Sequence, residues 1–459
     1  MRIRKILIKI GVVLLAVVAA VLLARAVLNF TEGRALTRAL AGLKAKGVPL
    51  TARELAPPCP DEDNAARLWK AYENMTIIPG RAAAGRKGRT VKVVEAREIV
   101  ARAWNDFSAG KPLLPADRAA LKDVIAKNSK ALELLAEMAN KSCFLYRDPA
   151  RPLAGQPVPD AIQWIATAKL LVFSALFSAE EGDVRGAVDT FLTGLKFTPL
   201  AAREGTTIAF LISLATTRLL SQFLGDICRD RTVEEADLVE LMAAMDPGPW
   251  RGRLAASFRG ERVMFVEVGE DFFLTGLGDL GSVFEGSSFW EKLGLWIIRP
   301  LIKKDIRRSL PDFEFLEAQA QLPYHQSREA LKVRTQQLEE RPWYAYVSKL
   351  MLSDAEATFM KKAQIEAIML ANRAGLACRL YKIKNGRYPE SLDELVPDLL
   401  DDVPTDPFTG KPMVYRREGE SFIVYSLGSN EKDDGGRSTY AITRLVMPKD
   451  DDWSWKEDR

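Results

Sequence analysis

The sequence predicts an α+β protein with three parts: an N-terminal transmembrane helix, a mostly α-helical middle, and a C-terminal domain in which a long helix packs on a small antiparallel sheet. Basic residues precede an apolar run at the N-terminus, helical periodicity dominates the middle, and two alternating segments follow a long helical pattern near the C-terminus. We therefore divide the chain into an anchor or signal peptide (1–30), an α-helical extracytoplasmic region (31–345), the C-terminal domain (346–449) and an acidic tail (450–459).

The N-terminal apolar run predicts how the chain meets a membrane. Basic residues up to Lys9 precede the uncharged stretch Ile10–Ala24. Because Lys9 can snorkel and the apolar character continues past Arg25, the segment from Ile6 to Leu28 reaches the ~20 residues that a spanning helix needs. The excess of basic residues before this segment predicts a cytoplasmic N-terminus, a single pass and a body on the extracytoplasmic side.

A cleaved signal peptide is the alternative interpretation of the same segment. The tripeptide Ala24-Arg25-Ala26 has the A-x-A form of a cleavage site. Both interpretations place the bulk of the protein beyond the membrane.

Composition argues against several functional classes. The chain of 459 residues has 65 basic and 61 acidic residues, and this near balance gives no basic footprint for nucleic acid. Its four cysteines (Cys59, Cys143, Cys228 and Cys378) are far apart, and His325 is the one histidine, so a zinc cluster is not expected. Buried free thiols are the default expectation for the cysteines; one disulfide is the alternative if they lie outside the cytoplasm.

Amphipathic patterns predict helices through the middle of the chain, for example over residues 116–140 and 254–272. Between residues 162 and 227, two helices joined by Glu181-Gly182-Asp183 resemble a tetratricopeptide-type hairpin, but no 34-residue period recurs, so a simple helical bundle is favoured over a solenoid. Trp290, Trp296 and their apolar neighbours form a patch that either touches the membrane surface or packs against the bundle.

The C-terminal pattern is the most specific one. Ser353 and Glu356 have the spacing of a capping box, and the long helix that follows carries small residues on one face and ends at Asn385-Gly386. The segments 413–415 and 422–425 predict a hairpin, and residues 439–446 predict a third strand.

Three of these segments also resemble a known family. NGRYPESLDELVP, DPFTGKPMVYR and YSLGSNEKDDGG occur here in the order in which corresponding segments occur in the major (G-type) pseudopilin of bacterial type II secretion systems. The resemblance covers roughly residues 345–449 and implies that family's fold for the C-terminal domain.

The resemblance also implies a calcium site in the acidic loop. Carried over by position, Leu427 would offer its carbonyl, Asn430 stands where an Asp is usual, and Asp433 and Asp434 would be the carboxylate ligands. Calcium takes six to eight oxygen ligands, which a flexible acidic loop can supply. Because Asn430 removes one negative charge and the loop is shorter than the family's, a Gly-rich surface turn with solvated acids remains the alternative.

The rest of the chain does not resemble a pilus subunit. Phe30-Thr31-Glu32 follow the apolar run, whereas in pseudopilins Phe-Thr and a Glu open it. We found no G-x-S-x-G, P-loop or H-E-x-x-H motif, so we do not expect an enzyme. The sequence favours a non-enzymatic, membrane-anchored protein of the bacterial envelope, in the inner membrane, with envelope or secretion-related proteins as partners. The alternatives are a helical-repeat adaptor with a purely structural C-terminal domain and, less favoured, an extracytoplasmic hydrolase.

Overall fold

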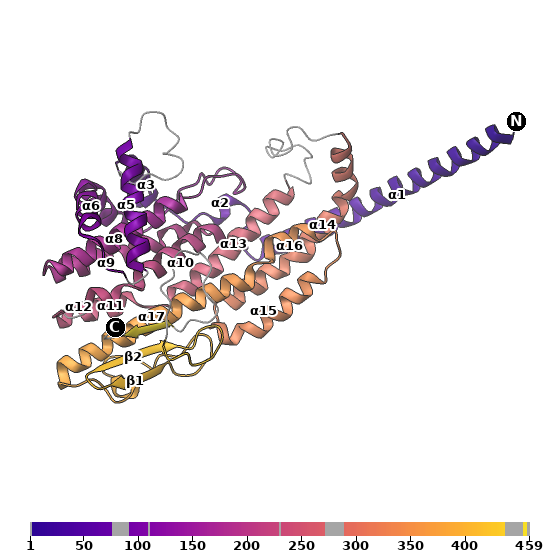
Figure 1. The fold of residues 1–459 in the computed structure, drawn as a ribbon. Coiled ribbons are helices and arrows are strands. Elements are labelled where there is room, and N and C mark those ends of the chain that lie inside the picture. Colours follow the sequence, from indigo (N-terminus) through magenta and orange to yellow (C-terminus); the bar gives the residue numbers. More distant parts are fainter. Residues whose placement is uncertain are drawn as a thin grey trace.

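The described part of the structure is mostly helical (70%), and a small antiparallel sheet lies near its C-terminal end (Figure 1). The computed structural model describes residues 2–75, 91–108, 111–228, 231–270, 289–436 and 453–456. With the labels of Figure 1, the helices are α1 (Arg2–Ala45), α2 (Ala52–Leu55), η1 (Asp61–Asp63), α3 (Ala65–Met75), α5 (Val91–Ser108), α6 (Pro115–Lys127), α7 (Ser129–Ala139), α8 (Ala161–Glu180), α9 (Val184–Phe197), η2 (Thr198–Glu204), α10 (Thr207–Ser221), α11 (Leu224–Cys228), α12 (Glu235–Ala244), α13 (Pro249–Glu270), α14 (Phe289–Ala320), α15 (Tyr324–Glu339), α16 (Tyr346–Leu352), α17 (Ala355–Asn385) and η5 (Leu392–Leu395). The strands are β1 (Val414–Glu418), β2 (Ser421–Ser426) and β3 (Trp453–Lys456).

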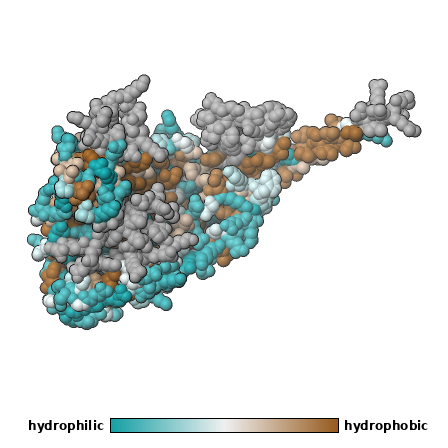
Figure 2. Space-filling model, in the orientation of Figure 1, coloured by the Kyte–Doolittle hydropathy of each residue, from teal (hydrophilic) through white to brown (hydrophobic). Residues whose placement is uncertain are grey.

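Helix α1 projects from the body, and its apolar side chains from Ile10 to Leu28 are mostly exposed (Figures 1 and 2). It is long and apolar enough to cross a membrane. Its second half runs alongside α14, where Lys303 Nζ donates to Asn29 Oδ1 at 2.9 Å and Arg307 pairs with Glu32 at 3.0 Å. The helix therefore continues beyond the apolar run and into contact with the body.

The helical body has one large apolar core. In its centre, the rings of Trp69, Trp164 and Phe197 pack together, with centroids 4.4 Å apart between Trp69 and Trp164 and 4.5 Å apart between Trp164 and Phe197. Helices α8 and α9 form the predicted hairpin, and the turn between them contains Gly182 at φ 89°. Residues Ala161–Glu180 and Thr207–Cys228 are also apolar enough to span a membrane, but 67% of each is buried inside the body.

One predicted helix is divided in two. The segment 116–140 forms α6 and α7, which meet at Asn128 (φ −99°, ψ 6°). The Asn128 side chain is buried and donates from Nδ2 to the Val124 carbonyl at 2.8 Å. Asparagine competes with helical backbone hydrogen bonds in this way, which explains why amphipathic periodicity alone missed the break.

Helix α17 lies between the helical body and the sheet. On the body side, Asn372 donates to the Ser221 carbonyl at 2.8 Å and Arg379 donates to the Cys228 carbonyl at 2.7 Å. On the sheet side, Gly375 lies so close to Trp455 of β3 that an added Cβ would be 2.3 Å from the ring. The prediction of a long helix on a sheet is confirmed, and the helix is buried on both sides.

The sheet has the order β1-β2-β3, and both neighbouring pairs are antiparallel. The hairpin and the helix end at Gly386 (φ 75°) are as predicted. The third described strand, β3, belongs to the segment 450–459 that we expected to be an acidic tail, so that prediction is wrong for Trp453–Lys456. The buried Trp455 ring explains this difference, because its apolar surface outweighs the acidic character of its neighbours. The predicted strand 439–446 lies outside the described residues.

The capping-box prediction is also wrong. Ser353 is the C-cap of α16, and α17 starts after Asp354 without a side-chain cap. The chain passes from α16 into α17 with little interruption, so the first turn of α17 has backbone neighbours that an isolated helix start would lack.

Candidate functional site

The acidic loop that follows β2 is held by side chains at both of its ends. Tyr425, near the end of β2, donates its hydroxyl to Asp433 Oδ1 at 2.7 Å, and the Gly435 N–H donates to the same oxygen at 2.9 Å. The hydrogen bond from Tyr425 is the main reason why the pKa of Asp433 is lowered. Asn430 donates from Nδ2 to Asp434 Oδ2 at 2.8 Å.

The four residues proposed for calcium lie in one loop, where they take part in three separate contacts. Asn430 touches Asp434, whereas Asp433 is turned toward Tyr425, and Leu427 donates its N–H to Asp406 Oδ2 at 3.0 Å. In the described part of the chain, no three His, Cys, Asp or Glu side chains are grouped closely enough to hold a metal ion. A calcium ion would have to draw on backbone and amide oxygens together with the Asp433 and Asp434 carboxylates.

Asp406 is the residue at this site that the sequence did not reveal. Its side chain is 1% exposed and accepts hydrogen bonds from the Phe408 N–H (2.9 Å), the Ser426 hydroxyl (2.8 Å) and the Leu427 N–H (3.0 Å). The bond to Phe408 is that of an Asx turn, for which Asp before Pro in a turn is a sequence signal. Asp406 thereby fixes the point where the acidic loop leaves β2.

The loop also contacts the helical region. Arg328 of α15 forms an ion pair with Glu431, which has φ 57°. His325, the one histidine, donates its backbone N–H to the Pro407 carbonyl at 3.0 Å, and its ring lies against Gly410. These contacts give His325 a positional role between α15 and the C-terminal domain.

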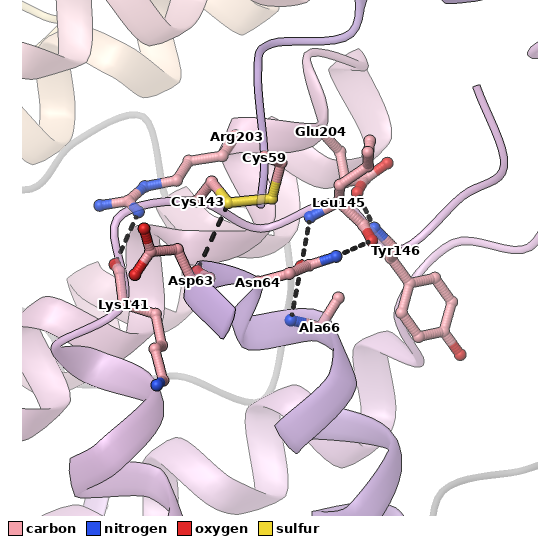
Figure 3. The surroundings of a disulfide bond; sticks show 10 residues. All are labelled: Cys59, Asp63, Asn64, Ala66, Lys141, Cys143, Leu145, Tyr146, Arg203 and Glu204. Atoms are coloured by element: carbon pink, nitrogen blue, oxygen red, sulfur yellow. Dashed lines mark hydrogen bonds between the residues drawn. A yellow bond between two sulfur atoms is a disulfide. The ribbon is translucent and has the colours of Figure 1, made fainter. Parts of the chain in front are cut away.

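A disulfide joins Cys59 to Cys143 in the helical body (Figure 3). The default expectation of free thiols is therefore wrong for this pair, while Cys228 and Cys378 are buried and keep their thiols. Beside the disulfide, Asn64 connects the two chain segments: its Nδ2 donates to the Leu145 carbonyl at 3.0 Å, and its Oδ1 accepts from the Leu145 N–H at 2.9 Å (Figure 3). Sequence spacing could not pair cysteines that are 84 residues apart.

The same region borders a cleft of about 1040 Å³. Four basic side chains, Arg67, Lys70, Arg147 and Arg151, line it together with two acidic ones, Asp148 and Glu267. Both carboxylate oxygens of Glu267 are occupied, since they accept from the Ala52 and Leu153 N–H groups at 2.7 Å. Three of the four basic side chains are paired with carboxylates, Arg67 with Asp61, Arg147 with Glu204 and Arg151 with Asp148, so the charges around this cleft are largely balanced.

Arg147 is the deepest charge beside the cleft. It is 7% exposed, donates to the Glu204 carbonyl at 2.6 Å and lies 3.2 Å from the Glu204 carboxylate. Burial lowers the pKa of Arg147 and raises the pKa of Glu204, since both charged forms lose solvation. The pair ties the loop after Cys143 to η2.

Comparisons with protein-family models, with curated proteins and with solved structures found no match to this chain. The functional argument therefore rests on the geometry described above and on the residues of the C-terminal segments.

Proposed function

We propose that this chain is a non-enzymatic, single-pass protein of the bacterial inner membrane, whose extracytoplasmic body presents a type II secretion pseudopilin-like C-terminal domain to envelope or secretion-related proteins. The observation that carries the proposal is α1. Its exposed apolar segment continues without a break into a helix packed on α14, so one element joins membrane and body.

The Cys59–Cys143 disulfide supports an extracytoplasmic body. Disulfides persist in the periplasm and outside the cell but are rare in the reducing cytoplasm. The orientation is tested by treating spheroplasts with protease and following the body with an antibody. Digestion in intact spheroplasts agrees with the proposal, and protection until the membrane is lysed contradicts it.

The hairpin of the C-terminal domain is the surface proposed for protein contacts. Glu420, in its turn, is exposed, whereas α17 is buried between sheet and body. Deleting the C-terminal domain would uncover the core of the helical body and therefore would not test the proposal cleanly. A photo-crosslinking residue at position 420 in cells keeps the fold intact.

The alternative, a helical-repeat adaptor that binds through residues 160–230, predicts the opposite crosslinking result. Ile208 of α10 is exposed and provides the matched position. Adducts with secretion or envelope proteins from position 420 and none from position 208 favour the proposed domain. The reverse pattern favours the adaptor, which is less supported because α8 and much of α10 are covered by neighbouring helices.

Calcium binding by the acidic loop is a separate proposal, supported by Asp433 and Asp434 within one loop. The test is thermal melting of the full chain with chelator or with added calcium. At a concentration ten times a Kd of ~1 mM, a ligand that binds only the folded state stabilises it by about 1.4 kcal/mol. The shift should disappear in Asp433→Asn/Asp434→Asn and remain in Asp401→Asn, which changes an exposed carboxylate elsewhere in the domain. Equal melting with and without calcium rules out a useful site.

A further inference from the structure

The most exposed large apolar side chains outside α1, among the described residues, lie in one short segment. They are Trp343 (74%), Tyr346 (68%) and Leu350 (65%). Tyr346 and Leu350 are one helical turn apart in α16, so they share a face. Aromatic and apolar side chains that are exposed together indicate a surface that meets another phase or molecule.

This segment lies at the end of the body from which α1 projects. Helix α16 packs on α14, where Ser348 donates its hydroxyl to Asp305 Oδ1 at 2.7 Å and its N–H to Asp305 Oδ2 at 3.0 Å. In the loop before α16, the Tyr344 ring lies 5.7 Å from Lys304 Nζ. Figure 1 shows α16 and the α1–α14 junction at the same end of the molecule.

Helix α14 begins at the same end of the body (Figure 1). Its first turns stand steeply across the line of α1 (Figure 1). Pro300 lies inside this helix, and a proline there removes a helical hydrogen bond, which favours a bend. Trp296 (41%) and Ile297 (43%) are exposed, so the bundle does not cover them. Arg25 lies over the Trp296 ring at 3.2 Å and donates from Nε to the Trp296 carbonyl at 2.9 Å.

Positive charge is concentrated beside these residues. Arg25, Arg299 and Lys303 lie together, and in the described part of the chain none of the three has an ion pair with a carboxylate. Burial, then Arg299 and Arg25, lower the pKa of Lys303. An anion placed among these three groups would relieve their mutual repulsion.

We propose that Trp296, Ile297, Trp343, Tyr346 and Leu350, here called the collar, rest in the headgroup layer of the bilayer that α1 crosses, and that Arg25, Arg299 and Lys303 bind the phosphate of an anionic phospholipid there. The inference rests on the proposed anchoring by α1. Two observations select lipid as the occupant. Helices α14 and α16, which carry four of the five collar residues, lie at the end of the body from which α1 projects, and Arg25 of α1 lies over the Trp296 ring (Figure 1). Trp, Tyr and basic side chains are the residues that favour a membrane–water interface.

Collar depth is tested with the full chain in vesicles of phosphatidylcholine and phosphatidylglycerol. The variants Leu350→Cys and Ile297→Cys carry an environment-sensitive fluorophore, and Val333→Cys on α15, also exposed (55%), is the matched control. The two remaining thiols are buried. We expect lipids with a nitroxide near the headgroup to quench the labels at 297 and 350 and to leave the label at 333 unchanged.

Headgroup preference is tested by the lipid that co-purifies with the chain from mixed vesicles. Removing one basic side chain near an anionic surface should lower the ratio of phosphatidylglycerol to phosphatidylcholine roughly fivefold. We expect this loss in Arg299→Gln and recovery in Arg299→Lys. Lys46→Gln, which changes an exposed side chain just after the end of α1, should leave the ratio of phosphatidylglycerol to phosphatidylcholine unchanged.

The outcomes separate the collar from the anchor. If the chain floats with vesicles while the labels at 297 and 350 stay unquenched, the collar is refuted and the anchor stands. A chain that does not float refutes the anchor itself. Labels shielded from both lipid and aqueous quenchers mean that protein covers this surface, which also overturns the proposal. An unchanged lipid ratio in Arg299→Gln refutes the phosphate site.

Discussion

Removing the Cys59–Cys143 disulfide should cost the protein a large part of its stability. The two cysteines are 84 residues apart, and in the chain-entropy model a cross-link closing a loop of that length stabilises the folded state by about 4–5 kcal/mol. We expect a loss of this size in Cys59→Ala/Cys143→Ala, compared with a total of about 5–15 kcal/mol for a typical domain.

Contacts in the folded state give a reason to expect most of this loss of about 4–5 kcal/mol in stability. The Ala65 N–H donates to the Cys143 carbonyl at 3.0 Å, and Asn64 bonds to Leu145 in both directions. These hydrogen bonds hold the two segments together when the sulfurs are absent, so the folded structure should change little. The effect of the cross-link then falls mainly on the unfolded chain.

Urea unfolding of the full chain in detergent, followed by tryptophan fluorescence, measures this loss. The wild type with reductant should unfold at the same urea concentration as the double variant, and reductant should not affect the variant further. Four reactive thiols in the unfolded, unreduced wild type would show that no disulfide forms. An unchanged unfolding midpoint in the double variant would refute the entropic argument.

Three further predictions concern the C-terminal domain and one buried lysine. Asp406→Ala leaves three donors without this acceptor, two of them buried and one partly buried, which should destabilise the loop by about 3 kcal/mol. Hydrogen-exchange mass spectrometry should then show roughly hundredfold faster amide exchange over residues 405–428, and unchanged exchange would contradict the role given to Asp406. Gly375→Ala places a Cβ against the Trp455 ring and should destabilise the folded protein by about 1–3 kcal/mol. A double-mutant cycle with Trp455→Ala should show that the two substitutions are coupled. Additive effects would mean that β3 does not pack against α17 at Gly375. Burial lowers the pKa of Lys169 to about 8. Between pH 8 and 10.5 the unfolded chain therefore binds more protons than the folded one, and the free energy of unfolding should rise with pH. Urea unfolding of Lys169→Met should lack this rise, and a pH profile identical to that of the wild type would contradict the lowered pKa of Lys169.

Local signals in the sequence predicted the helix and hairpin elements well. Residues close together in the sequence determine three of these features: the end of α17 at Gly386, the α8–α9 hairpin and the β1–β2 hairpin. Each was visible as a turn residue or as a hydrophobic periodicity. The same reasoning failed where a distant partner decides the structure. Ser353 and Glu356 have the spacing of a capping box, but the preceding helix α16 occupies that position.

The third strand and the disulfide show the same limit more strongly. Trp455 is buried because Gly375, 80 positions earlier, leaves room for its ring. The residues next to Trp455 in the sequence do not predict that contact. Within the candidate site, the loop residues Asn430, Asp433 and Asp434 were predicted from the resemblance of their segment, and their binding of calcium stays a prediction. Asp406 was missed because its partners Ser426 and Leu427 come after the β1–β2 hairpin in the sequence, whereas Asp406 comes before it.

The attachment of α1 to α14 determines how the protein meets its neighbours. A helix of 44 residues at 1.5 Å per residue is about twice as long as the hydrocarbon core is thick. The second half of α1 is held against α14 by the Asn29–Lys303 hydrogen bond and the Glu32–Arg307 ion pair. Helix α1 therefore cannot rotate relative to the body as it could on a flexible linker. If α1 crosses a membrane as proposed, a partner in that membrane would meet this body at one height and from a limited set of directions, and its search would be confined to two dimensions.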